Sequence, residues 1–529
     1  MIFLGVVSMS GYKIVLTADR SLMSTYGGSL FLGFATSGPV SGLPFYRAFM
    51  HFILRPVPVG SNGEAILAPY GLRAIEASLI ESGVADRSEV IVAPPRTLSR
   101  VIGDETRIIG ISTMDPKGLG PASSTFSGPY GIVHSESYTA AKFKELLSSA
   151  AIRRARERGV KIVVGGYGAW QLDINDMVEL GIDYIIVGEG EIEAPKLFKQ
   201  IIEGTAPEPP KIITVSEVPD RIPRIQGGTI GGLIEVSRGC GRGCYFCSST
   251  LRRLRHRPLE DIIHDVKVNA NAGLKCVCLH AEDILHYGGT PIEIRPKKVL
   301  KLFESAISVE GIEFVCISHA ALASIAEKSG LVEKISELLN LTPKRWMGFQ
   351  TGIETGSPRL IEKYMHMKPY PFKPNEWPEV VEQAFAIAND NNWIPAATLI
   401  VNLPGETEDD VLKTVELVER LKPYKSLIVP LLYVPIKELS APTMRMTEDA
   451  KWYHWELYRA VWRHDMKWLK VLADEHLKHA NRLVKYAVDG FVNFVVHFLD
   501  KFVVSRHVKK KIEELKREQL SKLVIARSR

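Results

Sequence analysis

The sequence predicts an α/β protein with three parts: a doubly wound parallel sheet, a partial (β/α)6 barrel and a C-terminal helical region. Two series of short apolar strands that alternate with helical segments predict the first two parts, because such alternation is typical of parallel sheets. A helical and basic stretch after residue 440 predicts the third. The 529 residues, 46% hydrophobic and 24% charged, suffice for several globular domains. We place the domains at 1–212, 213–440 and 441–529.

The first series of elements precedes residue 203. Its helices are expected at 71–80, 139–158 and 194–202, where apolar residues recur at helical spacing. A Gly- and Pro-rich segment, 27–63, is long for a loop and is therefore expected to cover a site or to pack on another domain, whereas 204–211 has the composition of a linker. The expected strands are 12–17, 89–94, 107–113, 161–165 and 183–187.

The second series follows the linker and supplies six strand–helix steps. Its helices are expected at 259–270, 297–306 and 380–388. In parallel βα barrels the chemistry lies at the C-terminal ends of the strands, so residues that follow these strands are the first candidates for a site. The expected strands are 233–236, 275–280, 313–318, 346–352, 396–401 and 427–434.

All six cysteines lie between residues 240 and 316. A secreted disulfide framework distributes more cysteines more evenly, so we expect a reducing, cytoplasmic compartment. The N-terminus lacks a basic segment ahead of its apolar residues, and no run reaches the about 18–20 apolar residues that span a bilayer. The sequence therefore predicts neither a signal peptide nor a membrane span.

Three of the cysteines, Cys240, Cys244 and Cys247, form a C-x3-C-x2-C motif directly after the first strand of the second series. Three thiolates at this spacing can hold three irons of a [4Fe–4S] cluster and leave the fourth iron open to another ligand. A zinc site is one alternative, but zinc requires a fourth protein ligand, for which His256 is the nearest candidate. A buried trio without metal is the other.

The motif and three later segments together resemble the radical S-adenosylmethionine (SAM) superfamily. An aromatic residue, Phe246, precedes the third cysteine, and the resemblance extends over residues 230–435. It implies that SAM chelates the open iron, that one electron from the cluster cleaves the sulfonium, and that the 5′-deoxyadenosyl radical removes hydrogen from an unactivated C–H bond. The three segments are 352–360, 364–368 and 402–408.

The resemblance also implies which residues bind SAM. Phe246 is expected near the adenine, and Glu282 or Asp283 near the amino group, at the end of the second barrel strand. The alternative for Glu282 and Glu354 is a strand-end carboxylate satisfied by a helix N-terminus or an arginine. No catalytic residue is assigned. The expected SAM-binding residues are Phe246, Glu282, Asp283, Ser318, Gln350 and Glu354.

The other three cysteines do not predict a second cluster. Cys276 and Cys278 alternate on an expected strand and point the same way, and Cys316 is the only further thiol. We interpret all three as core residues. The expected cofactors are therefore one [4Fe–4S] cluster and SAM, served by an external electron donor of the ferredoxin or flavodoxin type.

The strands of the first series end in glycine-rich turns, which allow the backbone to approach a flat or phosphorylated ligand. Ahead of a radical SAM barrel, these turns resemble the Rossmann-like, cobalamin (B12)-binding domain that many superfamily members carry. The loop 115–120 has no His to ligate cobalt, so cobalamin is expected either to bind without a protein axial ligand or not to bind. The expected cobalamin-binding residues are Ser112, Gly165, Gly166, Gly188 and Glu189.

The C-terminal region carries the net positive charge of the chain. From residue 441 onward there are 19 Lys and Arg against 11 Asp and Glu, and the apolar segment 491–504 precedes a basic cluster at 506–511. This pattern predicts a helix in a membrane interface, with a buried core helix and a solvated basic tail as the alternative. We therefore expect peripheral membrane contact and a small-molecule or lipid substrate, and no nucleic-acid partner.

The layout resembles the archaeal tetraether-lipid modifying enzymes, among them the ring synthases that join carbons of isoprenoid chains. This resemblance implies hydrogen abstraction from an archaeal membrane lipid and formation of a C–C bond or ring. The first alternative is a cobalamin-dependent radical SAM C-methyltransferase. The second is a tRNA-modifying enzyme of the methylthiotransferase type, which the helical C-terminus disfavours because that family usually ends in a small β-barrel RNA-binding domain.

Overall fold

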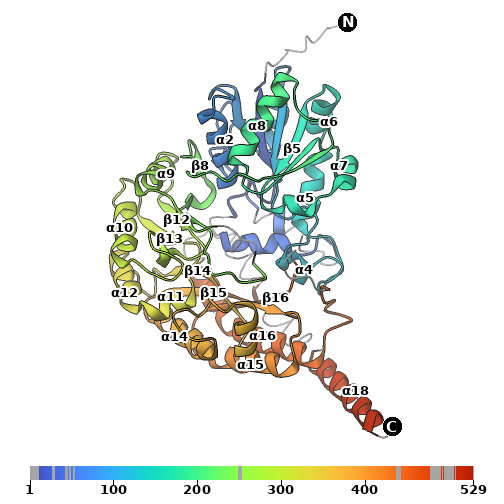
Figure 1. Cartoon of the computed structure of the whole chain (residues 1–529), viewed down its shortest axis with the longest axis vertical. Helices are drawn as coiled ribbons and strands as arrows, with labels where there is room; N and C mark the ends of the chain where they lie inside the picture. The colour runs from blue at the N-terminus through green and yellow to red at the C-terminus, as the bar shows by residue number, and fades with distance from the viewer. Residues whose placement is uncertain are drawn as a thin grey trace. The chain divides into compact units, whose positions relative to one another are not determined.

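The computed structural model of the chain is shown in Figure 1, coloured from the N-terminus to the C-terminus. The described residues are 11–26, 30–41, 46, 49–51, 54–247, 253–435, 442–476, 486, 490, 492–493, 506 and 508–527. The chain forms two compact units, of which the first holds Met1–Glu235, Arg257–Cys278 and Ser308–Phe314. The second holds Val236–His256, Leu279–Ile307 and Val315–Arg529. The three predicted domain boundaries stay predictions.

A six-stranded parallel sheet forms the centre of the first unit. Its order is β3-β1-β4-β5-β6-β7, and each neighbouring pair is parallel. The direction of winding reverses between β1 and β4, and in open α/β sheets ligands bind at the carboxyl ends of the strands beside such a reversal. The strands are β1 (Ile14–Ala18), β3 (Val90–Val92), β4 (Ile108–Ser112), β5 (Lys161–Gly165), β6 (Tyr184–Val187) and β7 (Lys211–Thr214).

Apolar clusters lie on both faces of this sheet, because successive residues of each strand point to opposite sides. On β4, Ile108 packs into a cluster with Phe198 of α8, whereas Ile109 packs into another cluster with Phe143 of α5. The α/β class with parallel sheets is confirmed. The helices of this unit's N-terminal part are α2 (Tyr70–Glu81), α3 (Leu98–Val101), α4 (Pro121–Phe126), α5 (Tyr138–Leu147), α6 (Ala150–Glu157), α7 (Ile174–Leu180) and α8 (Gly190–Glu203).

Two local predictions in this region are wrong. The expected helix 139–158 is two helices, because the side chain of Ser149 accepts a hydrogen bond from the N–H of Ile152 and starts a new helix. Lys211, assigned to the linker, is the first residue of β7, which pairs with β6. The sheet therefore continues to Thr214, beyond the predicted end of the domain.

All six strands of the second series are present, and they form two sheets of three. One sheet has the order β13-β12-β9, and the other is parallel with the order β14-β15-β16. In the part of the chain that the structure describes, an isolated parallel bridge between His319 and Gln350 joins the two sheets. A closed run of six barrel strands stays a prediction. The strands are β9 (Leu233–Glu235), β12 (Cys276–His280), β13 (Phe314–Ile317), β14 (Met347–Glu354), β15 (Trp393–Val401) and β16 (Leu427–Leu432).

Two buried tryptophans fix helices to the sheet that contains β14 and β15. Trp377 donates to the carbonyl oxygen of Ile353 at 3.1 Å, and Trp393 donates to Ser336 Oγ at 2.9 Å. Such side chains bury a large apolar area while their N–H groups find partners. The helices of this series are α9 (Leu259–Asn271), α10 (Pro296–Ile307), α11 (Leu322–Glu327), α12 (Ser329–Leu338), α13 (Pro358–Tyr364), α14 (Trp377–Asp390) and α15 (Glu408–Arg420).

The C-terminal region begins with a long helix, α16 (Trp452–His476), which packs on α15 and on the edge strand β16. Asp465 accepts a hydrogen bond from the N–H of Ile428 at 2.9 Å, and His464 Nε2 lies 2.8 Å from Ser426 Oγ. Because an open edge strand can pair with other chains, this cover protects the sheet. The last helix is α18 (Lys509–Arg527).

The membrane prediction depends on the apolar segment 491–504. Apart from Val492 and Asn493, that segment lies outside the described residues. Among the helices that the structure describes, none is long and apolar enough to cross a membrane. Peripheral membrane contact stays a prediction.

Candidate functional site

The loop that carries the three cysteines has a backbone that alternates between the two signs of φ. Gly239, Gly241 and Gly243 have φ angles of 81°, 71° and 69°, whereas Cys240 and Arg242 between them lie outside this region. Alternation of this kind turns successive N–H groups toward one point and forms a nest for an anion. An iron–sulfur cluster bound by thiolates is such an anion, so the glycines explain the composition of the motif.

Hydrogen bonds hold both ends of this loop. Before the cysteines, β10 (Ser237–Arg238) pairs antiparallel with β11 (Arg255–His256). Within the cysteine motif, the N–H of Tyr245 donates to the carbonyl oxygen of Tyr364 in α13 at 3.0 Å. The loop is therefore fixed to the strand ends rather than free to move away from them.

The three thiols lie close enough to influence one another. Burial raises the pKa of Cys244 to about 12, although the Lys368 ammonium acts to lower it, and burial also raises the pKa of Cys240. A metal replaces such protons, because the thiolate is the form that binds. Among the described His, Cys, Asp and Glu side chains, no three converge on a point that a single metal ion can occupy.

Arg242, between the first two cysteines, ties the loop to the end of β12. Its buried guanidinium donates to Asp283 Oδ2 at 2.8 Å and to Ser324 Oγ at 2.9 Å, and it lies 3.1 Å from His286 Nε2. The other oxygen of Asp283 accepts two backbone N–H groups. Both carboxylate oxygens are therefore used by the chain itself, and Asp283 holds the cysteine loop; its role in binding SAM stays a prediction.

The carboxylate of Glu282, unlike that of Asp283, is not engaged by the described residues. It follows β12, is half-buried, and its negative charge acts on Cys240. Within the described residues, no hydrogen bond or ion pair engages its carboxylate. An open carboxylate beside the first cysteine is suited to the ammonium group of a ligand. Of the two acids predicted at this strand end, the geometry favours Glu282.

Glu354 lies at the end of β14, where its φ of 65° accompanies an irregularity in the strand. Its Oε1 accepts a hydrogen bond from Lys368 Nζ at 3.0 Å, and its Oε2 accepts one from Thr398 Oγ1 at 3.4 Å. Burial acts to lower the pKa of Lys368, but the Glu354 carboxylate and the Cys244 thiol raise it overall. Lys368 therefore stays charged beside Cys244, and Glu354 is a satisfied carboxylate that holds this ammonium in place.

Ser318 and Gln350 belong to a row of polar side chains that runs from the ends of β12 and β13 to the middle of β14. Ser318 Oγ lies 2.8 Å from His280 Nδ1 and 2.9 Å from His319 Nδ1. Gln350 also hydrogen-bonds to His319, whose pKa is lowered by burial to about 3. The side chains of both predicted residues are thus engaged with histidines, and His319 is neutral at physiological pH.

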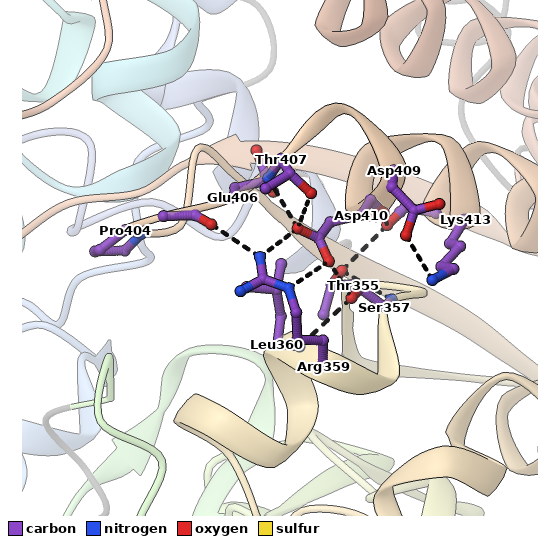
Figure 2. Close-up of polar contacts among 12 residues, drawn as sticks. Thr355, Ser357, Arg359, Leu360, Pro404, Glu406, Thr407, Asp409, Asp410 and Lys413 are labelled. Atoms are coloured by element: carbon purple, nitrogen blue, oxygen red, sulfur yellow. Dashed lines mark hydrogen bonds and ion pairs between the residues drawn. The ribbon is translucent and has the colours of Figure 1, made fainter.

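A buried carboxylate, Asp410, joins the two later segments on which the resemblance depends (Figure 2). One of its oxygens accepts hydrogen bonds from Ser357 and from Arg359 Nε, and the other accepts from the Arg359 guanidinium and from Thr407. Arg359 also donates to the carbonyl oxygen of Gly405 at 2.8 Å. Burial acts to raise the pKa of Asp410, but these hydrogen bonds hold it well below its usual range. The loops that follow β14 and β15 are therefore fixed to each other.

The positions of Phe246 and of the remaining cysteines are compared with their predictions. Phe246 is half-buried in the cysteine loop. Cys276 and Cys278 lie on β12 and Cys316 lies on β13, and none of them is in a disulfide. Cys278 is buried, as the core interpretation expects, whereas Cys276 and Cys316 are half-buried.

The predicted cobalamin residues lie at the carboxyl ends of β4, β5 and β6, beside the reversal of the sheet. Ser112 is half-buried, and a Cβ on Gly165 would meet only a carbonyl oxygen at 3.8 Å, so this part of the edge has room for a ligand. Gly166 instead packs on the turn after β4, where a Cβ would lie 2.7 Å from a carbonyl oxygen. Gly188 has a φ of 122°, and Glu189 is the buried N-cap of α8.

One residue at this edge was not predicted. Asp19 follows β1 and is buried, with Oδ1 accepting the N–H of Ser21 at 2.7 Å, whereas Oδ2 has no partner among the described residues. Burial raises its pKa to about 6. A buried oxygen without a partner at the reversal of the sheet is a position that a ligand N–H can fill. Its place directly after the first strand was the signal that could have identified it.

Sequence reasoning also missed Arg242, Lys368 and His319. Arg242 lies inside the cysteine motif, Lys368 closes the segment 364–368, and His319 follows Ser318, so each is close in sequence to a residue that was singled out. Their contacts join elements that are far apart in the chain, and neither spacing nor periodicity encodes those contacts.

Several known proteins are similar to this chain in sequence. A tRNA-2-methylthio-N(6)-dimethylallyladenosine synthase of Thermotoga petrophila is 24% identical over 316 residues, which cover 55% of this chain and 67% of the relative. The ribosomal protein uS12 methylthiotransferase RimO of Leptospira biflexa is 26% identical over 213 residues, which cover 40% of this chain and 43% of the relative. The chain thus spans between less than half and two thirds of these relatives.

One solved structure has a similar fold. The radical S-adenosylmethionine methyltransferase TsrM from Kitasatospora setae, solved with tryptophan and a SAM analogue, has a TM-score of 0.52 and 15% identity, covering 80% of this chain and 74% of that one. At this identity the similarity concerns the fold alone.

The family comparison concerns the region of the three cysteines and the strands after them. Residues 234–418 match the model of the Radical SAM superfamily, which confirms the resemblance found in the sequence. This match includes the cysteine loop, Glu282 and the segment around Asp410. The chain therefore contains a radical SAM domain, whose cofactors are a [4Fe–4S] cluster and S-adenosylmethionine.

Proposed function

We propose that the chain is a cobalamin-dependent radical SAM methyltransferase. The observation that carries this proposal is the presence of two ligand sites in one chain: the cysteine nest with its open carboxylate, and the ligand-binding edge of the parallel sheet. The similarity in fold to TsrM supports it, because that protein is a radical SAM methyltransferase. TsrM has also been solved with cobalamin and a [4Fe–4S] cluster bound.

In the second unit, the residues have separate roles in this proposal. Cys240, Cys244 and Cys247 hold the cluster, and Glu282 accepts the amino group of SAM. Lys368 lies beside Cys244 and balances part of the negative charge of the cluster. The cluster and SAM supply the electron transfer and the radical chemistry when bound, while the chain orients them and excludes water.

In the first unit, the sheet edge fits a ligand with amide groups. Gly165 leaves room at the end of β5, and Asp19 Oδ2 is a buried acceptor that an amide N–H of a corrin can fill. The carboxylate of Asp115 is already engaged by Gln171 and by the N–H of Gly120. Corrin binding without an axial ligand from this loop is therefore the form we propose. Bound cobalamin would serve as the carrier of the methyl group.

Methylthio transfer is a second candidate, and the sequence relatives favour it. Such a reaction must also deliver a sulfur atom, and the only cysteines beyond the cluster motif lie on β12 and β13. Because these relatives act on tRNA and on a ribosomal protein, they give no support to the expectation that nucleic acid is not a partner. The relatives and TsrM also support both alternatives better than the predicted lipid ring formation.

The test follows the methyl group of SAM and distinguishes methyl transfer, methylthio transfer and lipid ring formation. Protein purified from cells supplied with hydroxocobalamin and reconstituted with iron and sulfide is incubated with reductant and SAM labelled as CD3. The probes are a small-molecule extract, bulk tRNA and a lipid extract, each analysed by mass spectrometry. We expect bound corrin and a product in which CD3 replaces hydrogen.

Each other outcome counts against the proposal. An SCD3 group on tRNA indicates methylthio transfer, and loss of two hydrogens from a lipid indicates ring closure. Absence of corrin together with deoxyadenosine formation and no CD3 transfer overturns the proposal outright. The Cys244→Ala variant should abolish every product, whereas Cys278→Ala, outside the motif, serves as the matched control.

A further inference from the structure

A surface loop at 286–293 lies directly against the loop that carries the cysteines. A Cβ at Gly241, between the first two cysteines, would lie 2.5 Å from Pro291 Cγ. In addition, His256 Nε2 lies 3.1 Å from the carbonyl oxygen of Gly289. His256 belongs to β11, which pairs with the strand just before the cysteines. The loop 286–293 and the cysteine loop are therefore adjoining parts of one surface.

Each of these two loops exposes one large apolar side chain. Tyr245, between the second and third cysteines, is 58% exposed, and Ile292, next to Pro291, is 51% exposed. A single exposed apolar residue is ordinary on a protein surface, but several together with a polar rim mark a docking site for another protein. Two such side chains on adjoining loops supply the apolar part of such a site.

The helix that follows this loop, α10, begins with a run of cations. Between residues 295 and 301 the chain has four basic side chains and no acidic one, and all four are exposed. Arg295 pairs with Glu293 at 3.2 Å, whereas the three lysines form no ion pair within the described residues. Lys298 extends back over the loop, because a Cβ at Gly288 would lie 2.5 Å from its Cδ. The basic run therefore borders the loop that carries Ile292. Its members are Arg295, Lys297, Lys298 and Lys301.

The position of these lysines is unfavourable for the helix itself. Lys297 and Lys298 lie in the first turn of α10, which has no acidic residue. The N-terminus of a helix carries a partial positive charge, so cations there are repelled and anions are attracted. A protein partner with exposed carboxylates removes this repulsion when it docks. The charge on this surface thus favours an acidic partner.

We propose that Tyr245, Ile292 and the four cations of 295–301, together called the donor surface, dock an acidic protein that carries single electrons. The cluster of a radical SAM domain receives its electron from outside the chain, and the donor surface includes a residue of the cysteine motif itself. The lysines attract carboxylates of the carrier, and an apolar patch of the carrier covers Tyr245 and Ile292. Electron-transfer interfaces are small, which fits a surface of two loops and one helix end.

The transfer itself is a one-electron step in which no bond forms or breaks. The carrier is oxidised by one electron, and the cluster is reduced by one electron. Reductive cleavage of SAM needs this step whatever the substrate is, so the donor surface does not depend on methyl transfer. Nucleic acid would also be attracted by lysines, but its binding gives no reason for a position beside the cysteines.

The first test maps the docking site and requires no turnover. Oxidised flavodoxin, an acidic flavin protein, is mixed with the reconstituted enzyme and treated with a carbodiimide, which joins lysine amines to carboxylates in contact with them. We expect mass spectrometry to find Lys297, Lys298 or Lys301 in the cross-links, and high salt to prevent these cross-links. Cross-links confined to lysines outside α10 overturn the proposal. Displacement of flavodoxin by an equimolar amount of bulk tRNA also overturns it, because the surface then prefers nucleic acid.

The second test measures how fast flavodoxin hydroquinone reduces the cluster, followed by the EPR signal of freeze-quenched samples. We expect the double variant Lys297→Glu and Lys301→Glu to lower this rate at least about tenfold at low salt, because steering of the acidic carrier is reversed. Reduction by dithionite, which needs no docking, should keep the parent rate.

The matched control is the double variant Lys267→Glu and Lys334→Glu, on α9 and α12. Both lysines are exposed and form no ion pair in the described structure, and the variant changes the net charge by the same amount. A rate with flavodoxin within twofold of the parent, or an equal loss in the control, overturns the proposal. A parallel loss with dithionite assigns the lysines of α10 to cluster stability and overturns it too.

Discussion

The carboxylate of Asp283 accepts a hydrogen bond from the guanidinium of Arg242 at 2.8 Å, and this contact connects the cysteine loop to the end of β12. The partner of Arg242 lies 41 residues away in the chain. The side chains are 8% and 5% exposed, so the pair is shielded from water. The shape of the anion nest therefore depends on the buried ion pair between Arg242 and Asp283, which does not include any of the cysteines.

Removal of one member of this pair should destabilise the protein. We expect Asp283→Ala to lower the free energy of unfolding by about 3–5 kcal/mol, because it leaves the Arg242 guanidinium buried without its counter-ion. Iron content after reconstitution should fall as well. Denaturant unfolding and iron analysis measure the two effects. Lys413→Ala, which breaks an exposed pair with Asp409, is the control and should change stability by less than about 1 kcal/mol.

Two glycines of the nest provide a matched comparison. Both Gly241 and Gly243 have positive φ, so an alanine at either position should destabilise the loop by about 1–2 kcal/mol. At Gly241 the new Cβ would also lie 2.5 Å from Pro291 Cγ, whereas at Gly243 nothing lies within 4 Å. We therefore expect Gly241→Ala to lose more cluster, measured by iron content and visible absorption. Equal losses in the two variants contradict the nest geometry.

The pKa of Asp410 predicts a pH-dependent contribution to stability. Its hydrogen bonds with Arg359, Ser357 and Thr407 lower the pKa in the folded state below the ordinary value of about 3.9. The contribution is therefore complete above about pH 4 and is lost as the pH falls through the folded value. Asp410→Asn should be less stable than the parent at pH 7, and the difference should shrink in acid. A difference that stays constant between pH 7 and pH 2 contradicts this interpretation.

Asp19 should show the opposite dependence on pH. Burial raises its pKa to about 6, so between about pH 4 and pH 6 the folded state holds a proton that the unfolded state has released. The free energy of unfolding should therefore fall as the pH rises through this range. Asp19→Asn should lack this decrease and be more stable than the parent at pH 7, by up to about 3 kcal/mol.

Binding of a corrin allows a second measurement on Asp19. If Asp19 Oδ2 accepts an amide N–H of the ligand, bound cobalamin should reduce the pH dependence of the parent protein. Chemical denaturation with and without hydroxocobalamin measures this change. An identical pH profile in both conditions counts against a contact between Asp19 and the corrin.

The positions of most strands could be predicted from the sequence, because burial imposes a local pattern on each. Lys161–Gly165 is found where it was expected, and the cysteine loop follows β9. The pattern failed at Lys211–Thr214, a short edge strand next to a linker composition, and at Ser149, whose side chain ends one helix and starts another. Both errors concern features of one to four residues, which are too short to change the average hydrophobicity or helical periodicity of the surrounding sequence.

The site was predictable in kind but not in assignment of roles. Spacing predicted a cluster at the three cysteines and, with the resemblance to the superfamily, a SAM-binding acid at the end of β12. It could not show that Asp283 is engaged by Arg242 while Glu282 is open, because this difference depends on Arg242, which lies 41 residues before Asp283 in the chain. The same holds for Gln350, whose partner His319 comes from another strand.

Among the described residues, the two sheets of the second series are joined by one backbone bridge, between His319 and Gln350. In the described structure, the N–H of Gln350 donates to the Ser318 carbonyl at 2.8 Å and the N–H of Ala320 donates to the Gln350 carbonyl at 3.2 Å, and these two bonds stand in place of a full ladder. Because so few bonds cross this seam, the amide protons of Gln350 and Ala320 should exchange with solvent faster than those inside the ladders of either sheet.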